Sequence, residues 1–572
     1  MKGDNMRIVS LLLSSVLLAM MLSSVRAVEQ PRLGGTFVVA TTSDPSTYNM
    51  GTTVDWAPHE GSGADSIFDA LVYFDMNYTA KPELARSWTT SSDGLTWTFN
   101  LVQNATWHDG MPFTSADVKF SIETLYLPYH PYASRVFACV NRIETPDNYT
   151  VIFKLKYPFA SLLTYLSYNC GQVLPKHLYE GTNPLNNTHN LNPIGTGPFK
   201  FQEWVRGDHI TLVKNENYYM SGLPYLDKIV IKIIPDSAAR ILALEKGEVD
   251  SLLPWAIPLQ DFKRLTTLSG IHAEVPATWF SGANGIDINQ RTPPLSDVGV
   301  RKAIAHAINR TFIHQTAFFG IGLLPTGPIG QDLTWCYEPN VTKYEYNVTE
   351  ANRLLDQAGY SKGQDGTRFG LSLLYDVAAT EDTRAAEVIK QNLKDVGIDI
   401  TLKAVDRATL YDLYAVKWNF DLVIFKRSAG PDPYVALGRT YDSRNIKPVS
   451  GANSVGYNNT RVDTLFDMSG TEANQTIRAI YFREIQRILM EDLPMIPLWQ
   501  TIWPMAASTK FHNIRTAINP FGSLREVWWE GGNATVVQPD EGFPMMYIYA
   551  AVGIAIVAVV GTAAVYFRRK RK

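Results

Sequence analysis

The side chains that could do chemistry in this chain are its ten histidines, 55 acids and three cysteines. No two histidines lie four residues apart, so the helical pattern of zinc hydrolases is missing. Neither a Gly-x-Ser-x-Gly nucleophile turn nor a phosphate-binding Gly-x-x-x-x-Gly-Lys-Ser/Thr loop occurs. Glycosidases use pairs of acids, and Asp421 and Asp432 could form such a pair. A chain with 55 acids contains many pairs of this kind, so this pair is not evidence for a glycosidase. We therefore predict a protein without catalytic residues, metal ligands or a cofactor.

Two further sequence features, a glycine-rich stretch and the three cysteines, are weaker candidates for a functional site. The stretch Gly195-Thr196-Gly197-Pro198 is rich in glycine, but Pro198 lacks the N–H that a phosphate loop needs, so we interpret it as a tight turn. The cysteines are Cys139, Cys170 and Cys336, and their spacing matches no zinc site. One disulfide can form, for which Cys139–Cys170 is our prediction, and the third thiol has no partner in the chain.

The N-terminal end predicts export. Lys2 and Arg7 precede an apolar run at 8–22, and small residues lead to Ala27. This order is typical of a secretory signal peptide, which we assign to 1–27; an uncleaved signal anchor is the alternative.

The C-terminal end predicts a membrane anchor. Residues 545–567 contain no charge and are numerous enough to cross a bilayer, and five basic residues follow at 568–572. Positive charges stay in the cytoplasm, so the body lies outside the cell. Glycines and prolines in 531–544 predict a short stalk between body and membrane.

Composition limits the class of protein. A chain of 572 residues normally forms two or more domains, and 12% aromatic with 19% charged residues argues against disorder. Eight of the 52 cations and one of the 55 acids lie in the leader and tail, which leaves the body 44 cations and 54 acids. An acidic body argues against a nucleic-acid partner.

Sugar-acceptor sequons are also abundant. Ten Asn-x-Thr sequences lie between leader and anchor, where about four are expected by chance. They are candidate glycosylation sites: Asn77, Asn104, Asn148, Asn186, Asn309, Asn340, Asn347, Asn458, Asn474 and Asn533.

The elements that must position any site alternate between strand and helix. Strand patterns occur at 35–40, 95–101 and 229–234, and a helix pattern at 237–247 follows the last of them. Such alternation predicts mixed α/β lobes.

Three further helices follow in the second half of the body. Ser296 is predicted to cap one helix and Thr349 another. A third is predicted at 383–396, ending at Gly397 before a strand at 398–402.

Several long stretches resemble family 5 of the extracellular solute-binding proteins, the dipeptide/oligopeptide-binding type that supplies ABC importers. The resemblance covers roughly residues 34–525. It is carried by Leu84-Ala85-Arg86-Ser87-Trp88, Ser92-Asp93-Gly94, Leu95 to Phe99, Trp107 to Val118, Gly195 to Lys200, Trp204, Gly207, Asn215, Tyr218-Tyr219, Val300 to Ile304, Asn309-Arg310 and Ala351 to Tyr360.

This resemblance implies an α/β two-lobed periplasmic-binding-protein fold of type II (large cluster C) with a hinge and a cleft between the lobes. Lobe I would comprise 28–278, with a small extra subdomain, and 500–530, and lobe II would comprise 279–499. The hinge would lie where the chain crosses between them, near 278 and 499–501.

The resemblance also bears on the ligand. Peptide-binding relatives carry an Asp three residues before an Asp-Pro, and it pairs with the ligand's ammonium group. Here Asp432-Pro433 is present, but Ala429 occupies the matching position, and Lys426 and Arg427 are nearby cations. A neutral or acidic ligand is therefore favoured over an ordinary peptide. Some relatives, notably in archaea and thermophiles, bind oligosaccharides, and a membrane-anchored glycoprotein suits an archaeal surface.

Sugar ligands need aromatic platforms and polar side chains. Candidate ligand contacts are Trp499, Trp255, Trp279, Trp56, Asn284 and Arg427. Trp499 is the preferred candidate, because relatives place a cleft aromatic at this position near the hinge. Core packing is the alternative for each tryptophan.

We therefore predict a membrane-anchored extracellular receptor that captures an oligosaccharide or oligopeptide and delivers it to the transmembrane subunits of an ABC permease. A secreted hydrolase with an unrecognised site and a structural surface glycoprotein are the alternatives.

Overall fold

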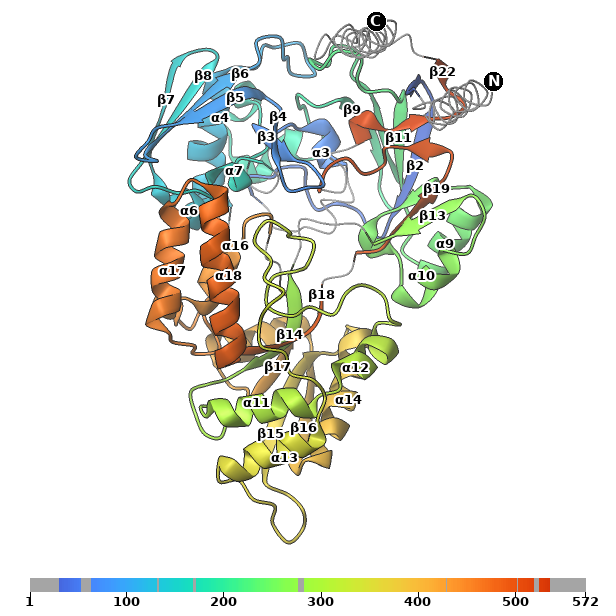
Figure 1. Cartoon of the computed structure of the whole chain (residues 1–572). Coiled ribbons are helices and arrows are strands. Elements are labelled where there is room, and N and C mark those ends of the chain that lie inside the picture. The colour runs from blue at the N-terminus through green and yellow to red at the C-terminus, as the bar shows by residue number, and fades with distance from the viewer. Residues whose placement is uncertain are drawn as a thin grey trace, which may run out of the picture. The chain divides into compact units, whose positions relative to one another are not determined.

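A computed structural model of the chain describes residues 30–52, 63–130, 133–167, 171–275, 282–427, 430–500, 503–518 and 524–534 (Figure 1). The chain divides into two compact units, Met1–Arg32 with Asn533–Lys572 and Leu33–Gly532. The predicted signal peptide 1–27, membrane span 545–567 and basic tail 568–572 lie outside the described residues. Within the described residues, no helix has the length and apolar character needed to cross a membrane.

The larger unit contains two main sheets, and each forms the centre of one lobe. The seven-stranded sheet of lobe I has the order β13-β19-β12-β2-β11-β10-β9. Its strands β2, β11 and β12 are parallel, and its other pairs are antiparallel. The bounds are β2 Thr36–Thr41, β9 Phe199–Val205, β10 His209–Lys214, β11 Lys228–Ile233, β12 Ser251–Leu252, β13 Ile271–Glu274 and β19 Met505–Ser508.

The second sheet belongs to lobe II and has the order β16-β15-β17-β14-β18. Strand β15 runs parallel to β16 and β17, whereas β14 is antiparallel to β17 and β18. The bounds are β14 Ala283–Ile288, β15 Phe369–Asp376, β16 Ile398–Val405, β17 Leu422–Phe425 and β18 Met495–Gln500. The chain enters this sheet between Glu274 and Ala283 and leaves it between Gln500 and Met505.

Helices cover both faces of the lobe II sheet (Figure 1). Because successive side chains of a strand point to opposite faces, Ile286 and Ile424 pack with the α11–α14 side, and Ala283 and Val423 pack with the α16–α18 side. Such two-sided burial explains the continuous apolar runs of these strands. The helices are α11 Val298–Ala307, α12 Arg310–Ala317, α13 Val348–Gln357, α14 Thr380–Asp395, α16 Pro433–Tyr441, α17 Thr460–Thr471 and α18 Gln475–Asp492.

Lobe I also contains a smaller antiparallel sheet with the order β5-β6-β8-β7. Strand β6 alternates between half-buried and buried residues, as its sequence pattern predicts. The bounds are β5 Ala85–Thr90, β6 Thr96–Leu101, β7 Val140–Asp147 and β8 Thr150–Leu155, followed by the short helix α7 Leu162–Tyr165. The further helices of lobe I include α4 Ser115–Phe120, α6 Ala133–Val136, α9 Ser237–Lys246 and α10 Leu259–Leu265.

Three helix starts differ from the sequence-based prediction. Asp297 caps α11 instead of Ser296, and Asn347 caps α13 instead of Thr349. Both side-chain oxygens accept a backbone N–H, at 2.7 Å and 2.9 Å. The predicted caps are wrong because Asp and Asn cap at least as well as Ser and Thr. Helix α14 starts at Thr380, three residues earlier than predicted.

The glycines of the 195–198 stretch serve a close backbone contact rather than only a turn. A Cβ on Gly195 would lie 1.8 Å from the carbonyl oxygen of Ile67, and one on Gly197 would lie 2.5 Å from that of Ser66. The Gly197 N–H donates to the Ile67 carbonyl at 2.8 Å. The His108 ring contacts the same stretch, since its Nε2 lies 3.0 Å from the Gly197 carbonyl oxygen. Burial lowers the pKa of His108 to about 4, so the ring is neutral at pH 7.

Candidate ligand-binding site

The carboxyl ends of the parallel strands of lobe II form the edge at which a ligand is expected. In open α/β sheets, ligands bind outside these strand ends. Strand β15 ends at Asp376 and β17 at Phe425. The first turn of α14, which contains Asp382, lies beside the segment that follows β17. The sequence-predicted residue Arg427 belongs to this segment.

Arg427 is held inside lobe II by an acid and several aromatic rings. Its guanidinium forms an ion pair with Asp287 and lies 3.1 Å from the Tyr414 hydroxyl. Its Cζ lies 5.2 Å from the ring centroid of Phe425 and 5.7 Å from that of Tyr441. Burial lowers the pKa of Arg427, and the adjacent carboxylate compensates its charge.

Lys426 also has an acidic partner. Its Nζ lies 3.5 Å from Oδ1 of Asp382, whose side chain is only 1% exposed. Both cations of the segment are therefore matched by acids. Their presence in the sequence no longer argues for an acidic ligand, because each of the two ion pairs has no net charge.

Asp382 makes the stability of lobe II dependent on pH. Burial raises the pKa of Asp382 from 3.8 to about 6, and Lys426 only partly opposes this shift. The folded state thus binds more protons than the unfolded state between pH 4 and 6, so this contribution to stability is present below pH 4 and lost as the pH rises through 6. At pH 7 the ionised group costs about 2 to 3 kcal/mol.

We therefore expect the difference in unfolding free energy between Asp382→Asn and the native chain to change with pH. From pH 4 to pH 7.5 it should shift in favour of the variant by about 2 to 3 kcal/mol. Urea unfolding of both chains at the two pH values measures this difference. Asp399→Asn, at an exposed position of β16, is the matched control. A difference between native and Asp382→Asn chains that stays constant with pH would contradict the prediction.

Trp499, Asn284 and Arg427 lie close together. Asn284 and Trp499 are register partners on β14 and β18, and the Asn284 side-chain oxygen accepts the backbone N–H of Arg427 at 2.7 Å. Trp499 is 3% exposed and stacks on Phe318, with ring centroids 4.2 Å apart. Its ring therefore packs in the lobe II core in this structure, on the last strand of the lobe II sheet before the chain leaves it.

The remaining predicted contacts fall where no side chain is described. Trp56, Trp279 and Ala429 lie outside the described residues, and only the backbone of Trp255 is described, in a short turn at Pro254–Ala256. Their role in ligand binding stays a prediction.

The structure contains a contact between the lobes that no pattern in the sequence indicated. The Tyr78 hydroxyl of lobe I donates to Oδ2 of Asp332 at 2.9 Å, and Nε2 of Gln500 donates to Oδ1 of the same acid at 2.7 Å. Asp332 lies in a connection without regular secondary structure, so no periodic pattern marks it. Its partners lie 254 and 168 residues away, a distance that local patterns do not report.

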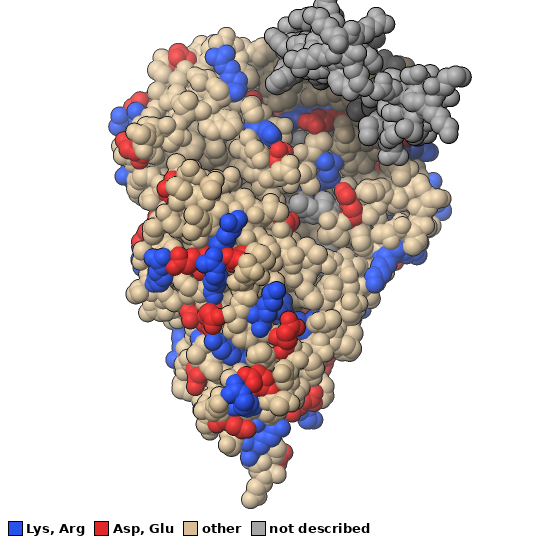
Figure 2. All heavy atoms as spheres, viewed as in Figure 1, with Lys and Arg blue, Asp and Glu red and all other residues tan. Residues whose placement is uncertain are grey.

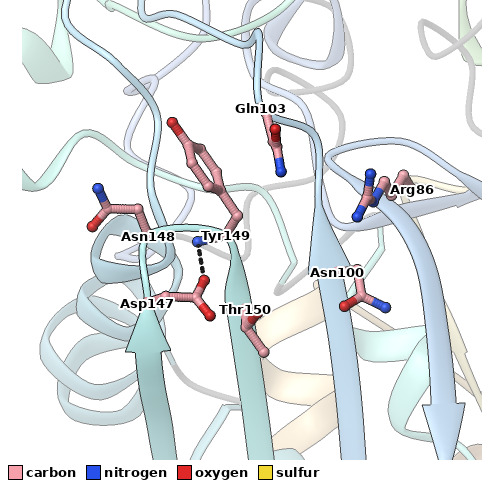
Figure 3. Close-up of a pocket in the computed structure, with 7 residues that line it drawn as sticks. All are labelled: Arg86, Asn100, Gln103, Asp147, Asn148, Tyr149 and Thr150. Atoms are coloured by element: carbon pink, nitrogen blue, oxygen red, sulfur yellow. Dashed lines mark hydrogen bonds between the residues drawn. The ribbon is translucent and has the colours of Figure 1, made fainter.

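A polar pocket of about 560 Å³ lies on the small sheet of lobe I (Figure 3). At the β7–β8 turn, Asp147 accepts the backbone N–H of Tyr149 at 2.8 Å. The pocket is shallow, and one of its residues, Asn148, is a sequon acceptor. Its lining residues are Arg86, Asn100, Gln103, Asp147, Asn148, Tyr149 and Thr150.

The state of the cysteines differs from the prediction. Cys139 is a buried free thiol, so the Cys139–Cys170 bond is absent from this structure. Burial raises the pKa of Cys139 to about 12, which keeps the thiol protonated and poorly reactive. Cys336 is also free and buried, and Cys170 lies outside the described residues.

Charges of both signs are interspersed on the face of the body drawn in Figure 2. Charged side chains of α17 and nearby segments also pair with one another, such as Arg461 with Glu484 at 2.7 Å and Arg444 with Asp467 at 2.7 Å. This face thus has no extended basic stripe of the kind that binds nucleic acid.

Comparisons with known proteins agree with this architecture. The chain is 26% identical to the oligopeptide-binding protein AppA of Bacillus subtilis over 533 residues, covering 89% of this chain and 94% of that protein. It is 27% identical to the probable D,D-dipeptide-binding periplasmic protein DdpA of Escherichia coli, with coverage of 82% and 89%.

Solved structures confirm the α/β two-lobed periplasmic-binding-protein fold. The DppA protein of Helicobacter pylori in complex with the peptide STSA superimposes with a TM-score of 0.71 at 26% identity, covering 87% of this chain and 99% of that one. AppA of Bacillus subtilis in complex with a nonapeptide gives 0.69 at 25% identity, covering 87% and 100%. A family model for bacterial extracellular solute-binding proteins, family 5 middle, matches residues 79–448, more than half of the chain. The chain therefore belongs to family 5 of the extracellular solute-binding proteins, which are binding proteins rather than enzymes.

Proposed function

We propose that this protein is the extracellular receptor of an ABC importer, which captures an oligopeptide or oligosaccharide between its lobes and delivers it to the permease. The family and the peptide complexes of its relatives support a binding role. The two crossings between the sheets support lobes that close on a ligand. Ligand binding then stabilises the closed state through its higher affinity for that state.

The pairing of both cations at the lobe II edge is the observation that most limits the ligand. Arg427 and Lys426 are each paired with an acid, and alanine occupies position 429, where peptide-binding relatives carry the acid that holds the ammonium group. A free amine thus has no dedicated carboxylate at this position. We propose that the ligand is held through neutral groups, such as peptide amides or sugar hydroxyls.

Blocking the amine of a peptide is therefore expected to change its affinity by less than about threefold, because a charge-assisted hydrogen bond would contribute about 1.5 to 3 kcal/mol. The measurement compares Ser-Thr-Ser-Ala, its N-acetyl form and a panel of peptides and oligosaccharides by melting temperature and tryptophan fluorescence. Bound ligand raises the melting temperature.

If the affinity for free peptides is at least tenfold higher than the affinity for their blocked forms, recognition through neutral groups is contradicted. The absence of a shift with every peptide and oligosaccharide would contradict the transport role and favour a structural surface protein. Turnover of a probe would indicate a hydrolase.

We further propose that the body is exported, glycosylated and anchored by the C-terminal segment 545–567. Nine of the ten sequon asparagines are exposed, and Asn309 is half-buried. Asn347 and Asn474 cap helices through their side-chain oxygens, so capping does not require the nitrogen that carries a sugar. The intact mass of the protein isolated from its own membranes tests both cleavage at 27 and the added sugars.

A further inference from the structure

The lobes also meet at the segment that leads into α7, away from the two chain crossings. The backbone N–H of Ala160 in lobe I donates to the carbonyl of Gly470, in α17 of lobe II, at 3.0 Å. Figure 1 shows α17 and α18 reaching this part of lobe I beside α6. Phe159 and Ser161 flank the contact and are 6% and 1% exposed, so the segment is buried where the lobes touch.

A fixed arginine extends the contact. Arg478 of α18 forms a two-pronged ion pair with Asp432, with N–O distances of 2.5 Å and 2.8 Å, and its Nε donates to the Ser469 carbonyl at 2.8 Å. These bonds lie within lobe II and hold the guanidinium in one orientation. In that orientation, Nη2 also donates to Oγ of Ser161 across the interface, at 3.4 Å.

An aromatic pair completes the contact. Tyr434 of α16 meets Phe159 edge-on, with ring centroids 5.9 Å apart. The Tyr434 ring fits because residue 470 is glycine, since a Cβ there would lie 2.6 Å from two carbons of the ring and from its hydroxyl oxygen. Gly470 thus both accepts the hydrogen bond from Ala160 and leaves room for the ring that packs on lobe I.

We propose that Phe159, Ala160 and Ser161 of lobe I and Tyr434, Gly470 and Arg478 of lobe II form a latch that stabilises the closed state, the arrangement in which the two lobes touch as they do here. Every contact across the interface is lost when the lobes separate, whereas the Arg478–Asp432 pair stays intact within lobe II. The latch therefore sets the closed fraction, and with it the apparent affinity for any ligand that binds the closed state. The proposal rests on the two-lobed fold and not on the identity of the ligand.

The test measures the closed fraction of the full-length protein without ligand. Spin labels at Thr89→Cys in lobe I and Lys394→Cys in lobe II, both exposed positions, report the distance between lobes by pulsed electron resonance. We expect Gly470→Ala, whose Cβ displaces the Tyr434 ring, and Tyr434→Ala, which removes the ring, each to lower the ratio of closed to open molecules about tenfold.

Gly438→Ala is the matched control. Gly438 is also a helical glycine of lobe II, but its added Cβ would make ordinary contacts with Phe466 at 3.7 to 3.9 Å. This variant is expected to leave the distance distribution unchanged, and all three variants should retain the helical circular dichroism of the native protein. An unchanged distance distribution in both latch variants, or an equal change in the control, would overturn the proposal.

Discussion

Arg525→Met is expected to lower the free energy of unfolding by about 3 to 5 kcal/mol, because it leaves buried acids without their cation. Nη1 of Arg525 lies 2.6 Å from Oε1 of Glu83, and both side chains are less than 10% exposed. The neighbouring Asp69 is also buried, and burial followed by the charge of Glu83 raises its pKa well above the ordinary value. The guanidinium also lies 4.4 Å from the ring centroid of Tyr73.

Urea unfolding followed by circular dichroism measures this loss. Arg142→Met is the control, since Arg142 pairs with Glu144 on the exposed surface and such a pair contributes little. If Arg525→Met does not fold, Arg525→Lys retains the charge and permits a measurement. A loss below about 1 kcal/mol in Arg525→Met would show that Glu83 and Asp69 do not depend on this cation.

Gly195→Ala is expected to cost at least about 3 kcal/mol, because its methyl group would overlap the backbone of another segment. The Cβ position lies 1.8 Å from the Ile67 carbonyl oxygen, and a backbone atom cannot rotate away as a side chain can. The segment would have to move as a whole, which breaks the hydrogen bond from Gly197 to Ile67.

Melting temperature and yield of folded protein measure this effect. Gly197→Ala, with a predicted approach of 2.5 Å to the Ser66 carbonyl oxygen, should be less severe and remain measurable if Gly195→Ala does not fold. Gly327→Ala is the control, since its Cβ would contact only the Met490 side chain, at 3.6 Å or more. Equal stability of the control and Gly195→Ala would contradict the close-approach argument.

The sequence predicts regular elements well where local chemistry decides them. Strand β11 and helix α9 lie within one residue of their predicted positions, because alternation and helical periodicity are local patterns. The helix starts were less accurate, since Ser296 and Asp297 are adjacent residues that can both cap.

The candidate site was less predictable for a different reason. Asn284, Arg427 and Trp499 were selected from the sequence, and the structure brings them together. Their acidic surroundings were not predicted, because Asp287 lies 140 residues from Arg427 along the chain. A sequence identifies a cation easily, but only the folded sheet shows whether that cation already has a partner.

The position of β19 has a consequence for the order of assembly. This strand lies between β13 and β12, yet it follows the whole of lobe II along the chain. A protein that emerges vectorially, N-terminus first, can complete the lobe II sheet once Gln500 is available. The lobe I sheet must wait for Ser508, with β12 and β13 present but not joined. In a chain that emerges from its N-terminus, all strands of the lobe II sheet are therefore available before those of the lobe I sheet, and β19 joins two strands made much earlier.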